Sequence, residues 1–178
     1  MSASDTFESG ATSSALQWEE AARRAASAYR TSAIEPATAM LRELLVFGLA
    51  GNAYAIAVER VREIVRMRDL TRVPRAPAWL LGVVALRGEV VEVIDLRLRL
   101  ALPARKSDRS SRIIMLHGDD DRVTGVLVDS VQEVYRVSEE AILPAQGFEA
   151  ASVLEMCRRG DEFVSILDVD RALEMRDG

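Results

Sequence analysis

The sequence predicts an all-β protein with short helices, built from two clusters of about five short strands each. Two observations carry this prediction. Apolar runs rich in Val and Ile recur along the chain, and Gly, Asn and Asp turn signals bound them. One polar stretch, Pro103 to Ser111 (PARKSDRSS), divides these runs into two groups and is typical of a linker. Short strands at this spacing indicate two small barrels, not a βαβ sheet.

The N-terminal 38 residues differ in composition from the rest and are interpreted as an extension, 1–38. Residues 1–12 are rich in Ser, Thr, Asp and Gly, and we expect them to be disordered. Residues 14–30 (SALQWEEAARRAASAYR) predict a helix with an apolar stripe from Trp18 to Tyr29. Such a stripe packs on its own domain or docks on a partner, and we favour the first reading.

The first strand cluster, 44–102, begins where the apolar period shifts towards two. Four of its strands are predicted at Leu44–Leu49, Ala53–Val58, Val83–Leu86 and Val90–Leu96. Between the second and third of these, a helical turn from Glu59 leads into a further strand that runs through Met67. Trp79 and the two leucines after it are expected to plug one barrel end. Asp95 is expected to cap a short helix that runs to about Leu102.

A β-hairpin is predicted where the last two of these runs meet at Arg87 and Gly88. Gly88 permits a positive φ at the turn, so the hairpin carries an arginine at its tip.

The second cluster, 111–167, follows the linker. Its strands are predicted at Arg112–His117, Val123–Val128, Val131–Val137, Val153–Cys157 and Phe163–Leu167. Asp168 is expected to cap a C-terminal helix over 168–175.

Composition excludes several classes of protein. Hydrophobic residues make up 49% and charged residues 29%, a globular balance. No apolar run approaches the roughly 20 residues that span a bilayer, and the acidic start MSASDTFESG lacks signal-peptide features, so we expect a cytoplasmic protein without membrane insertion. The net charge is -5, the basic residues are scattered along the sequence, and aromatics are 5%, which argues against nucleic acid as a partner.

Catalytic and metal-binding chemistry has little support. Cys157 is the single cysteine and His117 the single histidine. Asp119 to Asp121 are three adjacent carboxylates, a pattern far more typical of a solvated turn than of a metal site. No nucleotide-binding glycine motif and no GxSxG elbow is present. We therefore expect no enzyme and no cofactor, with a hydrolase or metal enzyme using His117 and the three aspartates as the alternative.

Two charged residues inside apolar patterns are more informative about function. Glu63 lies between Val61 and Val65, and Arg87 ends an apolar run. The two side chains are expected to pair at a semi-buried rim, where arginine suits bidentate pairing with a carboxylate. The residues alone leave two readings open: an intramolecular salt bridge, or a polar marker at the centre of an interface.

Three ordered segments resemble one known family. They are LLVFGLAGNAYAIAVERVREIV, TRVPRAPAWLLGVVALRGEVVEVIDLR and RVTGVLVDSVQEVYRVSEEAILPA, and they lie between about Leu44 and Leu173. The chain thereby resembles the CheW-like coupling proteins of bacterial chemosensory arrays. The resemblance implies a CheW-like domain over 39–176, with two SH3-like five-stranded barrels around a shared hydrophobic core.

The resemblance also implies a function. Members of the family bridge the cytoplasmic tip of methyl-accepting chemoreceptors to the regulatory domain of the histidine kinase CheA, without catalysis, and join that domain in rings. Residues here that match the family's protein-binding positions are Glu63, the Leu86-Arg87-Gly88 motif, and the apolar Val61 and Ile64 of a receptor-binding groove.

Two positions depart from the family pattern. Ala85 stands where Asn or Ser is common, and Glu92 stands where Pro is common. With the N-terminal helix, they favour as an alternative a specialised paralogue that modulates or localises an accessory chemosensory system for motility or development.

Overall fold

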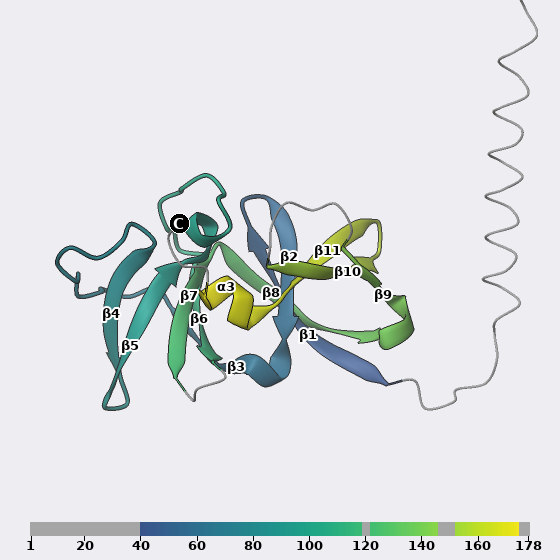
Figure 1. Ribbon diagram of the computed structural model, residues 1–178, viewed down its shortest axis with the longest axis horizontal. Coiled ribbons are helices and arrows are strands. Elements are labelled where there is room, and N and C mark those ends of the chain that lie inside the picture. Colours follow the sequence, from purple (N-terminus) through teal and green to yellow (C-terminus); the bar gives the residue numbers. More distant parts are fainter. Residues whose placement is uncertain (1–39, 119–121, 146–151, 175–178) are drawn as a thin grey trace, which may run out of the picture. The chain divides into compact units, whose positions relative to one another are not determined.

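The chain folds into two β-sheets with a few short helices, as seen in the computed structural model (Figure 1). The structure describes residues 40–118, 122–145 and 152–174. The all-β class is confirmed, whereas the predicted helix over 14–30 lies outside the described residues. The strands are β1 Leu41–Leu49, β2 Asn52–Ala57, β3 Val61–Arg66, β4 Leu80–Leu86, β5 Glu89–Asp95, β6 Arg112–His117, β7 Val123–Val128, β8 Ser130–Ser138, β9 Ile142–Pro144, β10 Val153–Arg159 and β11 Glu162–Leu167. The helices are η1 Val58–Arg60, α2 Leu96–Arg99, η2 Glu139–Ala141 and α3 Val169–Glu174.

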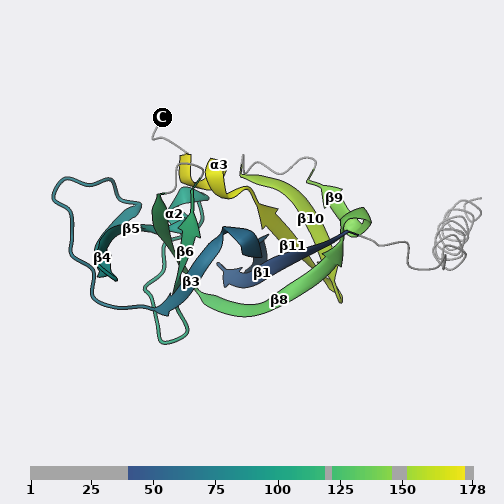
Figure 2. The ribbon, with the colours of Figure 1, turned by 90° about the horizontal axis from the view of Figure 1, so that it is seen from below.

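Strand pairing crosses the linker, which corrects the division into clusters 44–102 and 111–167. One sheet has six strands in the order β8-β1-β2-β11-β10-β9, and the other has five in the order β3-β6-β7-β5-β4. Figure 2 shows β8, β9, β10 and β11 at one side of the folded region and β4 and β5 at the other. Each sheet therefore takes strands from both sides of the linker. The sixth strand, β9, was not predicted because its three residues carry no recognisable period.

The crossed pairing has a physical reason. Strands β2 and β11 pair in parallel, as do β5 and β7, and a parallel pair needs a long connection that a tight hairpin cannot supply. The entropic cost of closing a loop rises only slowly with its length. Strand β1 can therefore pair with β8, although all strands of the five-stranded sheet lie between them in the sequence. The apolar pattern alone does not encode which strand edges meet.

Three apolar clusters explain why many strands lack polar alternation. In β1, Leu44 and Val46 pack in a cluster private to the six-stranded sheet. Their neighbours Leu45 and Phe47 pack in a central cluster that also receives residues from β5, β6 and β7. The five-stranded sheet has a private cluster of its own, with Val93 and others. Both faces of these strands are buried, so the shared core expected between the sheets is present.

Both short helices begin at the predicted aspartates. The Asp95 side chain accepts a hydrogen bond from the Arg97 amide at 2.9 Å, and Asp168 accepts one from the Arg171 amide at 3.0 Å. Helix α3 then packs on the central cluster through Val169. No helix in the described ranges is long and apolar enough to cross a membrane.

Cys157 is fully buried on β10 and offers a first test of this packing. Burial raises the pKa of its thiol, although Arg159 and Arg42 act in the opposite direction. Because only the thiolate reacts readily, we expect Cys157 to resist a disulfide reagent at about pH 8 in the folded protein and to react at once in denaturant. Thiol titration with and without guanidinium measures this difference. Rapid reaction of the native protein would contradict the buried placement.

Candidate functional site

The tip of the β4–β5 hairpin has an unusual backbone. Arg87 and Gly88 occupy the two turn positions, with φ of 50° and 87°. Two successive positive φ angles are the signature of a type I′ turn, whose twist matches the flanking strands. Glycine adopts this conformation freely, but an arginine does so at a cost. The arginine at the tip is therefore held in a strained conformation at an exposed position.

Two ion pairs join this tip to β3. The Arg87 Nη2 atom lies 3.3 Å from Glu63 Oε2, and Arg62 Nη1 lies 2.6 Å from Glu89 Oε2. Strand β3 is one edge of the five-stranded sheet and β4 is the other, yet the side chains of β3 meet the hairpin that β4 begins. The sheet is thus curved enough to bring its two edges within side-chain reach.

The expected pairing of Glu63 and Arg87 is present, but it is not bidentate. One nitrogen meets one carboxylate oxygen, and 72% of the Arg87 side chain remains exposed, against 20% of the Glu63 side chain. The other oxygen, Glu63 Oε1, is buried without a hydrogen-bond partner among the described residues. A buried acceptor without a donor is costly, so this site gains from one further donor.

The β3 face explains the burial of Glu63. A bulge at Arg62 shifts the register, and beyond it Glu63 and Val65 share one face of the strand. Val65 packs against the private cluster of the five-stranded sheet, so Glu63 lies at the mouth of that cluster. Leu86 packs against the same cluster and comes together with Glu63 and Arg87.

The other predicted residues are more dispersed. Val61 is half-buried against the central cluster. Ile64 is 40% exposed and faces away from Glu63, because neighbouring residues of a strand point to opposite faces. Gly88 is exposed, with open space where a Cβ would lie.

Sequence reasoning missed Val90. This residue is 73% exposed and pairs directly with Ala85, which is also exposed, so both side chains lie on one face of the hairpin. We call Glu63, Ala85, Arg87 and Val90 the hairpin-tip surface. Val90 belongs to an apolar run that otherwise predicts a core strand, and no signal in that run distinguishes it.

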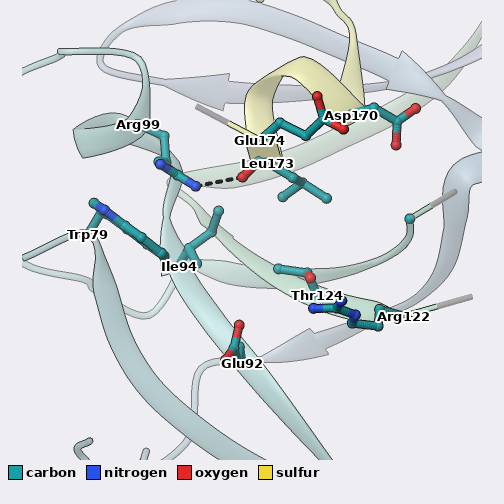
Figure 3. A pocket seen from close by; sticks show the side chains of 10 residues that line it. Trp79, Glu92, Ile94, Arg99, Arg122, Thr124, Asp170, Leu173 and Glu174 are labelled. Carbon is teal, nitrogen blue, oxygen red and sulfur yellow. Dashed lines mark hydrogen bonds between the residues drawn. The ribbon is translucent and has the colours of Figure 1, made fainter. Parts of the chain in front are cut away.

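A cavity of about 300 Å³ lies between the five-stranded sheet and α3 (Figure 3). It is lined by Trp79, Glu92, Ile94, Arg99, Gly118, Arg122, Thr124, Asp170, Leu173 and Glu174. The Arg99 guanidinium stacks on Trp79 at 3.9 Å from the ring centre and donates to the Leu173 carbonyl at 2.5 Å, which ties α2 to α3. Glu92 lies away from Asp170 and Glu174 in this view. No group of three or more metal-ligating side chains occurs in the described part of the chain.

His117 does not form a catalytic constellation with any described residue. It is exposed at the end of β6, where its carbonyl accepts a hydrogen bond from Arg60 Nε at 3.0 Å. Asp119 to Asp121 lie outside the described residues.

Comparison with known proteins gives a consistent result. The family model described as CheW-like domain matches residues 43–177. The protein named Chemotaxis protein CheW from Klebsiella aerogenes is 31% identical over 136 residues, which cover 74% of this chain and 81% of that protein. Chemotaxis protein CheW from Bacillus subtilis is 34% identical over 136 residues, which cover 74% and 86%. The crystal structure of the scaffolding protein TtCheW from Thermoanaerobacter tengcongensis superposes with a TM-score of 0.72 at 28% identity, over 77% of this chain and 95% of that one.

Proposed function

The chain belongs to the CheW family of chemotaxis coupling proteins, and from this premise we propose that it joins a CheA-type histidine kinase to chemoreceptor tips in a signalling array. It is a scaffolding protein and not an enzyme. Its proposed partners are the regulatory domain of the kinase, the cytoplasmic tip of a methyl-accepting chemoreceptor and other CheW-like domains in rings. The proposed location is the cytoplasm, beside membrane receptors.

The observation that carries this proposal is the hairpin-tip surface. It presents a largely exposed guanidinium and a buried carboxylate oxygen that lacks a donor among the described residues, with exposed apolar Val90 on the outer face of the same hairpin. Arginine with adjacent apolar area is typical of interface hot spots. We assign protein binding to Glu63, Arg87, Leu86 and Gly88 here, and to Val61 and Ile64, which share the opposite face of β3.

The proposal includes the shape of the two sheets, which we take to be SH3-like barrels. Two features support it. Each sheet encloses a private apolar cluster, and the edge strand β3 meets the β4–β5 hairpin through two ion pairs. A sheet that curls in this way leaves few unpaired edges.

Charge reversal at Arg87 tests the proposal. We expect Arg87→Glu to weaken binding to the kinase regulatory domain or to a receptor tip by about a hundredfold, because it removes a hot-spot cation and places two carboxylates together. Calorimetry with purified partner fragments measures binding, and circular dichroism checks that the β fold is intact. Arg136→Glu is the matched control, since Arg136 is also exposed and paired with a glutamate on a neighbouring strand, at 2.6 Å.

A swapped pair separates the two readings of the salt bridge. The double variant Glu63→Arg, Arg87→Glu restores opposite charges but inverts their positions. If Arg87 contacts a partner, the double variant stays defective in assembly. Recovery of assembly by the double variant, or normal assembly by Arg87→Glu, would show that the pair is only structural.

A further inference from the structure

The arginines of the described residues differ sharply in how they are paired. Most of these arginines have a carboxylate partner, such as Arg42 with Glu155 at 2.7 Å. Six basic side chains have neither an ion pair nor a hydrogen bond to any described residue: Arg66, Arg68, Arg72, Arg75, Lys106 and Arg109. Three of them, Arg68, Arg72 and Lys106, are exposed and line the same cavity.

This cavity has a volume of about 510 Å³ and lies where the β3–β4 connection meets the linker. Its floor is aliphatic: Met67, Leu70 and Leu81 pack against the private cluster of the five-stranded sheet, to which Leu127 belongs. The cavity therefore combines an apolar floor with a cationic rim. Residues 68 and 106 are far apart in the sequence, so the basic residues are scattered along the chain. The fold places these two at the same cavity.

The remaining charged groups of the cavity do not cancel its positive rim. Arg105 is paired with Asp108 at 2.9 Å. Asp95 is buried and its carboxylate caps α2. Asp69 is the one exposed carboxylate among the described lining residues, against three unpaired cations. The chain as a whole carries a net charge of -5, so this local excess of positive charge runs against its overall balance.

We propose that this cavity, which we call the basic cavity, binds an acidic segment of a protein partner, with carboxylates on the rim and an apolar side chain on the floor. Unpaired guanidinium and ammonium groups are the donors that carboxylates meet in charge-assisted hydrogen bonds. The concave aliphatic floor fits a side chain better than a flat layer of lipid headgroups. The described lining residues include no aromatic ring on which a nucleic-acid base stacks.

A labelled peptide tests the basic cavity. The probe is a fluorescein-labelled octapeptide of sequence EDLEDLED, and anisotropy follows its binding to the full chain at about 50 mM salt, where screening is weak. The triple variant Arg68→Gln, Arg72→Gln, Lys106→Gln should bind at least about tenfold more weakly. The matched triple variant Arg136→Gln, Arg158→Gln, Arg171→Gln removes the same charge from exposed arginines elsewhere and should stay within about twofold of the wild type.

Three further arms decide the nature of the ligand. The peptide EDAEDAED should bind more weakly than EDLEDLED, because it leaves the apolar floor unfilled. Phosphatidylglycerol vesicles and an oligothymidylate replace the peptide in the other two arms, and neither should bind in a manner sensitive to the first triple variant. No peptide binding by the wild type, equal weakening by both triple variants, or preference for vesicles or oligothymidylate would each overturn the proposal.

Discussion

Replacing Arg97 by methionine is expected to lower the free energy of unfolding by about 3 kcal/mol, the largest single effect that the structure implies. The Arg97 side chain is 2% exposed and forms an ion pair with Asp129, whose side chain is 14% exposed. It also donates to the Arg105 carbonyl at 3.1 Å, while Asp129 accepts from the Ala50 amide at 2.9 Å. Methionine keeps the length but leaves the carboxylate without its counter-charge.

Denaturant unfolding measures this loss, and a domain of this size should lose about 10 °C in Tm. The double variant Arg97→Met, Asp129→Asn should recover most of the stability, because asparagine carries no charge and still accepts from Ala50. Arg158→Met is the control: Arg158 is 67% exposed and lies 3.5 Å from Asp161, so its loss should cost less than about 1 kcal/mol. An equally small loss at Arg97 would refute the structural role of the buried pair.

Alanine at Gly82 is expected to cost a similar amount, about 3 kcal/mol, through a different mechanism. Gly82 has a φ of 148°, and a Cβ there would lie 2.5 Å from the carbonyl oxygen of Thr71. Thr71 exchanges two backbone hydrogen bonds with Val83, at 2.8 and 2.9 Å, and so covers the outer edge of β4. The added methyl group must displace Thr71 and break both bonds.

Gly51→Ala is the matched control for Gly82→Ala. Gly51 has a φ of 83° but nothing within 4 Å of its Cβ position, so alanine there carries the backbone strain without the clash. We expect a loss of about 1 kcal/mol, measured by the same unfolding experiment. Equal losses at the two glycines would mean that Thr71 gives way freely and that the edge contact contributes nothing.

The strands could be predicted from the sequence because burial on both faces leaves a strong signal. The run LLVFGL in β1 divides between two clusters, and an unbroken apolar run of that length is typical of a strand that is covered on both faces. Helix starts could be predicted because a capping aspartate acts within one turn. The hairpin partners β4 and β5 could be predicted from the turn between them, but distant partners could not, since β1 pairs with β8 through backbone groups that are the same at every residue.

The candidate site divides in the same way. The ion pair between Glu63 and Arg87 could be anticipated because charges within apolar patterns are costly and seek each other. The exposure of Val90 could not, because it depends on which face of the hairpin the rest of the sheet covers. The buried ion pair of Arg97 could not be predicted, because Arg97 and Arg99 occupy similar positions in the sequence. In the structure Arg97 pairs with Asp129, whereas Arg99 stacks on Trp79.

The pairing of strands across the linker has a consequence for biosynthesis. The five-stranded sheet is complete once β7 has left the ribosome at Val128. Strands β1 and β2 are made first, yet they must wait for β8 and β11, which end at Leu167. During that interval the face of β1 that carries Leu44 and Val46 lacks the neighbours that β8, β10 and β11 supply, and contacts so distant in sequence form slowly. We therefore expect this face of β1 to be the apolar surface that stays uncovered longest during synthesis.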